Sequence, residues 1–520
     1  MTLKDLADLI VPKYLEISEL EAKYPIRKQD VVTRFAPSPT GYLHTGSLYT
    51  AFINYLYAKN HQGVFYLRIE DTDQERLVDD AVNLLISSLK EFKIEYTNDE
   101  TYAPYIQSKR RLVYDSVLHY LILNDLAYPC FCTKASLDEL RLSQQKANIL
   151  TGYYGKYAKC RSLSVDEAYQ KIKNGEPYVV RFKSQKKHYV YHDLLRGDLN
   201  LMDNEFDIVI RKADLLPTYH FAHVCDDHFM RSTHVIRGEE WIASLPIHYA
   251  LFEACGFEIP KYLHLPTIMK LDNLKKRKLS KRKDPEANVS NLLALGYPKK
   301  AILAYLLHLA NSKYDGETDP FNYQLALNNF SLDGALFDLM KLNSIAKEYI
   351  ATLDFDTLIA EILEYATKYD QELLKYIKGD EAYFKKIMAI GRGGANPRKD
   401  DEKYSDILMR VGFFYREYFD KLPAIKLDYD EEVVKKVLAS FIKSLDILDE
   451  ELWLQFLKTS SKEIGFAKNK KEKEALGLKY MFSDYMAIVR ALLVKSNSSP
   501  NLFDVVRIVN KDEIFRRLLG

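Results

Sequence analysis

The sequence lacks the features that would place a protein in a membrane or outside the cell. No window reaches the roughly 18 apolar residues of a membrane-spanning helix. The N-terminal segment MTLKDLADLIVPKYLEISELEAKYP holds many acidic residues and no apolar signal core, which argues against secretory and mitochondrial targeting. Five cysteines in 520 residues do not suggest a disulfide framework. We therefore expect a cytoplasmic protein that does not associate with membranes.

The chain has almost no overall charge, and it lacks an internal repeat and a long low-complexity linker. Its formal net charge of +1 hides local clusters, of which Lys270 to Lys283 is the densest, with eight basic residues and one acidic residue. A solvated charged face is the usual explanation of such a run. This run, however, carries Leu279-Ser280 in its middle, which a solvated face does not need.

The order of sequence patterns predicts an α/β domain that is interrupted by an insertion. With 520 residues and 47% hydrophobic side chains, the chain can form several domains that each bury a core. Short apolar strands alternate with helical segments over residues 31–125 and again over 208–268, which indicates a Rossmann-like parallel sheet. Residues 126–207 break this rhythm with cysteines, many tyrosines and β-rich segments. We expect an inserted α+β domain there.

The two ends of the chain are predicted to be helical. Residues 1–30 form an extension whose first helix carries Leu3, Leu6, Leu9 and Ile10 on one face. Residues 269–345 contain the basic run and further helical segments, and residues 346–520 are helical almost throughout. The expected fold is thus a Rossmann-like α/β domain with an inserted α+β domain, followed by an all-helical C-terminal half.

The segment Arg34 to Ser47, RFAPSPTGYLHTGS, predicts an anion site. It follows a short strand and precedes a helical pattern, so backbone N–H groups and the helix dipole converge on one spot. Gly41 and Gly46 allow a ligand to approach the backbone closely, and His44 can donate to phosphate oxygens. The alternative is a proline-stiffened loop with an incidental histidine.

A second phosphate-binding element is predicted at Lys278-Leu-Ser-Lys-Arg282. Lys278 and Lys281 are three residues apart in a basic loop and could reach the phosphates of a nucleotide held at the His44 turn. Their positive charge would offset the negative charge that builds up on a triphosphate under attack. The loop is weak evidence alone, but it is strong together with the turn.

Both segments resemble the signature sequences of class I aminoacyl-tRNA synthetases, the HIGH and KMSKS motifs. The chain is most similar to bacterial-type glutamyl-tRNA synthetases, and the PSPTG form favours these over glutaminyl enzymes. The resemblance is dense from residue 31 to about 310. It rests on RFAPSPTGYLHTGS, LRIEDTD (Leu67 to Asp73), LPTYHFAHVCDDH (Leu216 to His228), THVIRGEEW (Thr233 to Trp241) and HLPTI (His264 to Ile268), in that order.

The resemblance implies a glutamate pocket. Its lining would be formed by Arg34, Ser38, Glu70, Tyr219, His223 and Arg237. Glu70 would take the α-ammonium group, and Arg76 would support the site nearby. The residue types also suit a dicarboxylate, because arginine binds carboxylates in a planar fork and Arg34 and Arg237 lie at predicted strand ends. Taken singly, each arginine could equally form a surface ion pair.

The resemblance also implies an ATP site. The residues concerned are His44, Gly46, Glu240, Trp241, Lys278, Ser280 and Lys281. Catalysis would fall to His44, Gly46, Lys278 and Lys281, through positioning and charge stabilisation. Mg²⁺ is expected to arrive with ATP, bound largely through phosphates and water.

Three departures from the family pattern stand out. Thr45 and Ser47 occupy the second and fourth positions of the HIGH-type motif, while His44 and Gly46 are kept. Ala213-Asp-Leu stands where the family often has Ser-Asp-Gly. The leader of about 30 residues is longer than usual, and the sequence does not explain it.

Cys130-Phe-Cys132 followed by Cys160 predicts a structural zinc site. A fourth cysteine or histidine ligand is missing, and similar proteins complete such a site with a tyrosine. Tyr154 is the predicted fourth ligand, with Tyr157 as the alternative. The competing explanation is three buried thiols without metal.

The leading hypothesis is a glutamate–tRNA ligase whose partners are tRNA(Glu), glutamate and ATP. We expect a monomer in which the insertion binds the acceptor end, residues 269–345 contact the tRNA stem, and residues 346–520 bind the anticodon. The short paralogue that charges a modified tRNA base lacks such a C-terminal half. A tRNA-binding protein without catalysis would have lost His44, Lys281 or Glu70, which are intact. A generic nucleotidyltransferase would not share the paired arginines. Charging of tRNA(Gln) stays open.

Overall fold

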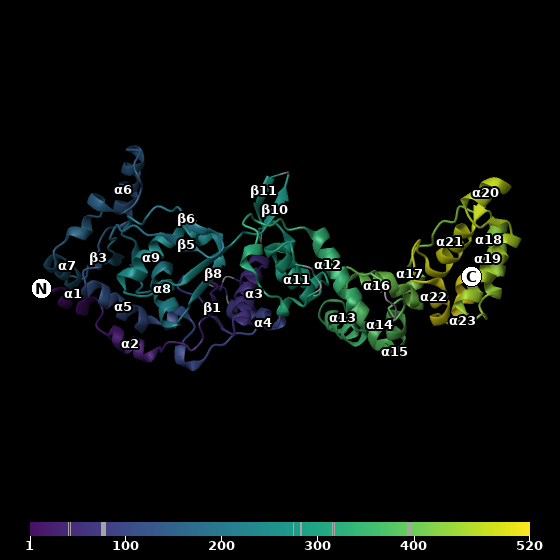
Figure 1. Ribbon diagram of the computed structural model, residues 1–520, viewed down its shortest axis with the longest axis horizontal. Helices are drawn as coiled ribbons and strands as arrows, with labels where there is room; N and C mark the ends of the chain where they lie inside the picture. Colours follow the sequence, from purple (N-terminus) through teal and green to yellow (C-terminus); the bar gives the residue numbers. More distant parts are fainter. Residues whose placement is uncertain are drawn as a thin grey trace. The chain divides into compact units, whose positions relative to one another are not determined.

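The computed structural model describes residues 1–39, 41, 43–73, 78, 80–273, 275–280, 283–314, 316, 318–392 and 398–519 (Figure 1). The chain divides into two compact units. The first comprises residues 1–291 and 303–338, and the second comprises residues 292–302 and 339–520. None of the helices in these described ranges combines the length and the apolar composition needed to cross a bilayer.

Parallel strands form the centre of the first unit. β1 (Val32–Phe35) pairs with β2 (Val64–Leu67), and α3 (Thr45–Asn60) connects the two strands. In the same way β8 (His234–Gly238) pairs with β9 (Lys261–Leu265), and α9 (Leu245–Ala254) connects them. The two pairs meet where the Thr233 N–H donates to the Val32 carbonyl at 3.0 Å. The Asn54 side chain of α3 donates to the Ile236 carbonyl at 2.9 Å, so this helix is fixed to both pairs.

The insertion shares strands with the parallel sheet. β3 (Ala127–Cys130), β4 (Val179–Phe182) and β7 (Val209–Arg211) form an antiparallel sheet next to α6 (Lys134–Lys146) and α7 (Val165–Lys173). β5 (Tyr191–Asp193) instead pairs with β9, and β6 (Gly197–Leu199) pairs with β5. The boundary at residue 207 therefore does not separate two sheets. β7 belongs with the insertion, while β5 and β6 extend the parallel sheet.

The N-terminal extension is part of the first unit's core. α1 (Leu3–Ile10) and α2 (Ile17–Lys23) pack on α5 (Arg111–Leu123), next to α8 (Tyr219–Phe229). Of the predicted apolar face, Leu6 and Ile10 are buried. Glu21 of α2 forms ion pairs with His228 and Arg231 at the end of α8.

The basic run forms a hairpin, and helices follow it. β10 (Met269–Asp272) pairs antiparallel with β11 (Lys275–Lys278), and α10 (Val289–Ala294) and α11 (Lys299–Ala310) come next. Earlier in the chain, α4 (Ala81–Glu91) follows β2. The remaining described elements are α12 (Leu339–Thr352), α13 (Phe355–Tyr369), α14 (Gln371–Gly379), α15 (Glu381–Met388), α16 (Asp406–Val411), α17 (Arg416–Lys421), α18 (Glu431–Lys443), α19 (Glu450–Glu463), α20 (Lys470–Leu476), α21 (Phe482–Val494), α22 (Leu502–Ile508) and α23 (Lys511–Leu519), with short strands β12 (Phe466–Ala467) and β13 (Tyr480–Met481).

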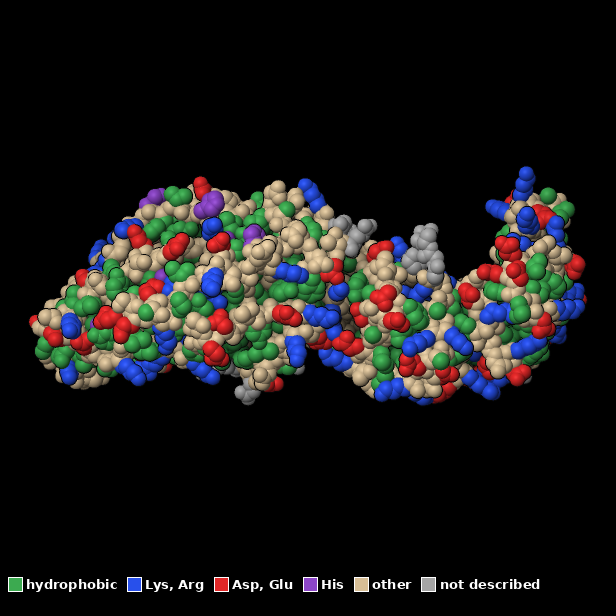
Figure 2. All heavy atoms as spheres, turned by 60° about the horizontal axis from the view of Figure 1, so that its bottom comes forward, with side chains coloured by type: hydrophobic (Ala, Val, Ile, Leu, Met, Phe, Trp, Pro, Cys, Tyr) green, Lys and Arg blue, Asp and Glu red, His purple; other side chains and the backbone are tan. Residues whose placement is uncertain are grey.

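The second unit is largely helical, as predicted for the C-terminal half, but it also contains the short strand pair β12–β13. A hydrophobic cluster that includes Phe441, Trp453, Leu457 and Tyr485 lies in its core. Figure 2 shows basic and acidic side chains interspersed over the C-terminal helices on the face in view. This mixture agrees with the near-zero net charge of the chain.

Candidate active site

A pocket of about 490 Å³ lies where β1 and β8 end and α3 begins. Its volume suits a small-molecule ligand, and ligands of α/β sheets gather at the carboxyl ends of strands. Most of the predicted site residues line it: Arg34, Ser38, His44, Gly46, Glu70, Tyr219, Arg237, Glu240, Trp241 and Lys278. Segments predicted to act together from distant parts of the sequence therefore meet in one cavity.

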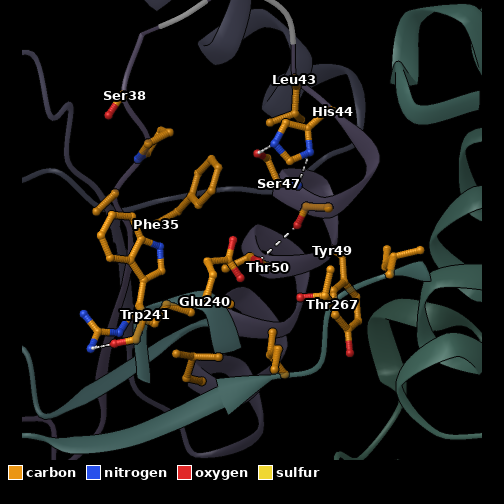
Figure 3. Close-up of a pocket in the computed structure, with 18 of the residues that line it drawn as sticks. Phe35, Ser38, Leu43, His44, Ser47, Tyr49, Thr50, Glu240, Trp241 and Thr267 are labelled. Carbon is orange, nitrogen blue, oxygen red and sulfur yellow. Dashed lines mark hydrogen bonds between the residues drawn. The ribbon is translucent and has the colours of Figure 1, made fainter. Parts of the chain in front are cut away.

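His44 forms the N-cap of α3 and presents the helix N-terminus to the pocket. Its Nδ1 accepts a hydrogen bond from the Ser47 N–H at 3.0 Å, which places the imidazole proton on Nε2, 2.9 Å from the Ser47 hydroxyl. A Cβ on Gly46 would lie 3.2 Å from the imidazole, so glycine allows this close approach. Figure 3 shows His44 and Ser47 at one end of the pocket and Trp241 at the other, with Thr50 and Glu240 between them.

A buried ion-pair network forms the floor of the pocket. Arg34 Nε lies 3.1 Å from Asp227 Oδ1, and the same oxygen accepts from Arg68 at 2.6 Å. Arg68 also donates to Glu70 at 2.9 Å. Burial opposes the charge on Asp227, but Arg34 and Arg68 hold the pKa of this carboxyl well below its usual range. The positive charge of Arg34 is thus already balanced inside the protein.

Burial has the opposite effect on the second carboxyl of this floor. It raises the pKa of Glu70, against the effect of Arg68. Arg68 and Asp227 were not predicted as site residues, although both lie within segments that carry the family resemblance. Their role depends on contacts between segments that are far apart in the chain.

Arg237 differs from Arg34 in its partners. It is 5% exposed, and its hydrogen bonds go to neutral groups: His264 Nε2 at 3.0 Å, the Trp241 carbonyl at 3.2 Å, the Tyr219 hydroxyl at 3.4 Å and, from both terminal nitrogens, His248 Nδ1 at 3.5 Å. Within the described residues it has no ion pair with a carboxylate. Because a buried charge is costly without a counter-ion, this arginine is prepared to receive an anion.

His223 does not line the pocket as predicted. It is fully buried behind Tyr219, stacks on His248 at 4.1 Å and has its Nε2 3.2 Å from the Tyr262 hydroxyl. Burial, reinforced by nearby positive charge, lowers the pKa of His223 and of His248 well below the usual value. Both rings are therefore neutral supports for the pocket wall.

The basic hairpin enters the pocket through one lysine. Lys278 Nζ lies 3.2 Å from Glu240 Oε1, and both side chains are exposed, so the pair is weak and easily exchanged for a ligand. Ser280 does not line the pocket. Its backbone N–H instead donates to Asp284 at 2.8 Å, and Arg277 binds the same carboxylate with both terminal nitrogens. Lys281 and Arg76 lie outside the described residues.

Three cysteines form a compact cluster that could hold a metal. The sulfur atoms of Cys130, Cys132 and Cys160 lie within 4.8 Å of one another, and those of Cys132 and Cys160 are 3.7 Å apart. Two sulfurs on one tetrahedral zinc ion, each about 2.3 Å from the metal, would be separated by about 3.8 Å. The donor set and its spacing therefore fit zinc.

The predicted fourth ligand must be corrected. The Tyr154 hydroxyl donates to the Leu150 carbonyl at 2.7 Å, and the Tyr154 ring packs edge-on against Tyr157. The adjacent Tyr153 occupies the expected place: its hydroxyl lies 3.3 Å from Cys132 Sγ and 3.5 Å from Cys130 Sγ. The sequence indicates a tyrosine in this tract but cannot show which of two neighbours turns inward.

Comparison with known proteins agrees with the site. The family described as tRNA synthetases class I (E and Q), catalytic domain, matches residues 30–334. The chain is 39% identical to a glutamate–tRNA ligase of Clostridium beijerinckii, with 99% of each chain covered. It is 38% identical to a glutamate–tRNA ligase of Clostridium perfringens, with both chains covered in full.

A solved structure agrees as well. A glutamate tRNA ligase from Elizabethkingia meningosepticum, crystallised in complex with its amino acid, matches with a TM-score of 0.74 and 27% identity over 94% of this chain and 99% of that one. The match extends over both the mixed α/β part and the helical part. Together with the pocket at the strand ends, these similarities show that the chain belongs to the glutamate–tRNA ligases, a family of class I aminoacyl-tRNA synthetases.

Proposed function

We propose that the protein activates glutamate with ATP to glutamyl-adenylate and transfers the glutamyl group to the 3′ terminal adenosine of tRNA(Glu). The observation that carries this proposal is the buried guanidinium of Arg237, which has hydrogen bonds but no carboxylate partner among the described residues and lies in the same pocket as the N-terminus of α3. One cavity thus offers an anchor for a carboxylate and a site for phosphates.

The proposed orientation of glutamate follows from the charges. The α-carboxylate must stay free to react, so the side-chain carboxylate is the group that Arg237 and Tyr219 hold. Glu70 offers a carboxylate for the α-ammonium group, while Arg34 and Ser38 complete the wall on the β1 side. Arg34 shares Asp227, so it contributes less positive charge than Arg237.

The proposed reaction needs no covalent group from the protein. The glutamate α-carboxylate attacks the α-phosphorus of ATP and pyrophosphate leaves; the terminal ribose hydroxyl of tRNA then attacks the mixed anhydride and AMP leaves. His44 Nε2 and the backbone at Gly46 would contact the nucleotide, Lys278 and Lys281 would stabilise the departing phosphates, and Glu240 and Trp241 would lie near the adenosine. Ser280, on the same loop as Lys278 and Lys281, would also contact ATP. ATP would enter as its Mg²⁺ complex.

We also propose a structural zinc ion at the insertion. Cys130, Cys132, Cys160 and Tyr153 would hold it, and the ion would tie strand β3 to the segment around residues 153–160. This donor set closes the coordination sphere, so no reactive role follows. Partial burial and contacts with the thiols raise the pKa of Tyr153, so binding would require the metal to displace its proton.

Family membership supports our proposal for the remaining partners. We expect residues 346–520 to bind the anticodon region and the insertion to bind the acceptor end, in a monomer that acts in the cytoplasm. Charging of tRNA(Gln) depends on how anticodon bases are read.

The decisive experiment is aminoacylation with radiolabelled glutamate and purified tRNA(Glu) and tRNA(Gln). We expect tRNA(Glu) to be charged. Charging of both would extend the function to tRNA(Gln), while charging of neither, beside an active control enzyme, would refute the proposal.

A further inference from the structure

His264 orients Arg237, and Asp193 in turn orients His264. Its Nε–H donates to His264 Nε2 at 3.0 Å, and His264 Nδ1 lies 2.8 Å from Asp193 Oδ2. Asp193 and His264 are both fully buried, and neither lines the pocket. The three side chains form a chain of hydrogen bonds that starts at β5, crosses β9 and ends at β8.

The geometry fixes the tautomer of His264. Asp193 is an acceptor only, so the imidazole proton must lie on Nδ1, and Nε2 keeps the lone pair that accepts from Arg237. Burial, with the charge of Arg237, lowers the pKa of His264, which agrees with a neutral ring. Asp193 is itself immobilised, because it also accepts from the N–H groups of Leu195, Arg196 and His264.

A neutral partner has a consequence that a carboxylate would not have. A carboxylate at the place of His264 would orient the guanidinium equally well, but it would also neutralise it. The imidazole orients Arg237 and keeps its own carboxylate partner, Asp193, on the far side of the ring. The charge of Arg237 is therefore available to a ligand in the pocket.

We propose that Asp193 and His264 are positioning residues that set the preference of the pocket for glutamate over glutamine. This inference rests on the proposed function, in which Arg237 binds the side-chain carboxylate. Glutamine has the same shape but carries an amide and no charge. It leaves Arg237 without a counter-ion, and its amide N–H₂ donor would face the N–H donors of the guanidinium. The preference should weaken when Arg237 is neutralised or misdirected.

The first test uses Asp193→Asn. The amide cannot accept from all the N–H groups that Asp193 serves, so His264 loses its fixed tautomer and Nε2 can carry a proton toward Arg237. We expect the KM for glutamate to rise about 10- to 100-fold, the range for a hydrogen bond to a charged group. The KM for ATP should change less than about threefold.

The second test asks whether Asp193 acts through His264. Glutamine at position 264 accepts a hydrogen bond without any tautomer to set, so Asp193→Asn combined with His264→Gln should bind glutamate better than Asp193→Asn alone. If the two substitutions instead weaken glutamate binding additively, the relay is refuted.

The third test isolates the charge. His264→Glu and His264→Gln, each combined with Asp193→Asn, are isosteric at position 264 and differ there by one negative charge. The preference is the ratio of kcat/KM for glutamate to kcat/KM for glutamine, measured by charging of tRNA(Glu). This ratio should be at least about 10-fold lower for the enzyme with His264→Glu than for the enzyme with His264→Gln. Equal ratios would overturn the proposal.

Two controls keep the outcomes separate. His119→Asn removes a buried histidine that pairs with Asp8 outside the pocket, and it should leave the ratio unchanged. Thermal unfolding of each variant, with calorimetric binding of glutamate to the full chain, distinguishes lost folding from lost recognition. If the unmodified protein does not charge tRNA with glutamate, the proposed function fails; if it does and the variants do not behave as stated, only the relay fails.

Discussion

Arg34 Nε lies 3.1 Å from Asp227 Oδ1, and both side chains are buried. The same carboxylate carries a second arginine, Arg68, so Asp227 is the counter-ion for two guanidinium groups beneath the pocket. Removing one partner of a buried ion pair leaves an uncompensated charge, which is more damaging than losing an exposed pair.

Asp227→Asn should therefore destabilise the first unit by about 3–5 kcal/mol. The two tryptophans lie one in each unit, so urea denaturation followed by Trp241 fluorescence in a Trp453→Phe background reports on the first unit alone. Glu176→Gln, which removes a largely exposed ion pair with Lys171, serves as the control and should change the midpoint little. Similar midpoints for both variants would contradict the assigned role of Asp227.

Lys281→Ala should reduce adenylate formation by orders of magnitude and leave glutamate binding almost unchanged. The reason is that the lysine is proposed to stabilise charge that develops on the phosphates only as the reaction proceeds. Pyrophosphate exchange with tRNA(Glu) present measures the rate, and calorimetry measures glutamate binding. Lys276→Ala removes an exposed lysine of β11 as the matched control. An unaffected exchange rate in Lys281→Ala would refute the role of the loop.

The sequence predicted the site better than it predicted the charges within it. The turn at His44 and the strand ends follow from local patterns, and the resemblance to a known family implied most of the pocket residues. The state of the two arginines does not, since Arg34 is neutralised by a residue 193 positions away while Arg237 is not. Whether a guanidinium is free for substrate is a property of the assembled core.

Two further differences have local causes. Tyr153 and Tyr154 are neighbours of the same type, and the contacts of Tyr154 with Phe206, Tyr157 and the Leu150 carbonyl leave Tyr153 to face the cysteines. The strands at 191–199 have the composition of the insertion but find their hydrogen-bond partner in β9. Pairing between strands that are distant in sequence leaves no signature in either strand alone.

Gly46→Ala should lower activity while leaving the protein at least as stable. Alanine favours a helix over glycine by roughly 0.5–1 kcal/mol, but its Cβ would lie 3.2 Å from the His44 imidazole and push the ring from its place. The expected result is a fall in kcat for charging with no drop in thermal stability. Gly379→Ala in α14 has nothing within 4 Å of its added Cβ and should leave kcat unchanged. A Gly46→Ala enzyme with full activity would show that the ring position does not matter.

Metal analysis should find one zinc ion per chain in protein purified without chelator. Cys132→Ser should abolish this zinc, and Tyr153→Phe should weaken it because the fourth ligand is lost. Tyr154→Phe is the matched control, since its hydroxyl is directed to the Leu150 carbonyl. Near-zero zinc in the unmodified protein would favour three metal-free thiols, and zinc loss in Tyr154→Phe alone would restore the original assignment.

The buried histidines should make the first unit less stable in mild acid. Burial, with the charge of Arg237, lowers the pKa of His220 to about 4, whereas an unfolded histidine titrates near 6.5. The unfolded chain therefore binds more protons between these values. Stability that is present above pH 6.5 is lost as the pH falls toward 4, by up to about 1.4 kcal/mol per pH unit for each such histidine.

His220→Asn should reduce the pH dependence of the free energy of unfolding by the contribution of one histidine. Urea denaturation at several pH values between 6.5 and 4, followed by Trp241 fluorescence in the Trp453→Phe background, measures the free energy of unfolding of the first unit. His220→Gln is a second replacement that does not titrate in this range, and it should lower the slope by the same amount as His220→Asn. If His220→Asn instead preserves the slope, then His220 takes up its proton equally in the folded and unfolded chain, and burial at this position does not keep the ring neutral.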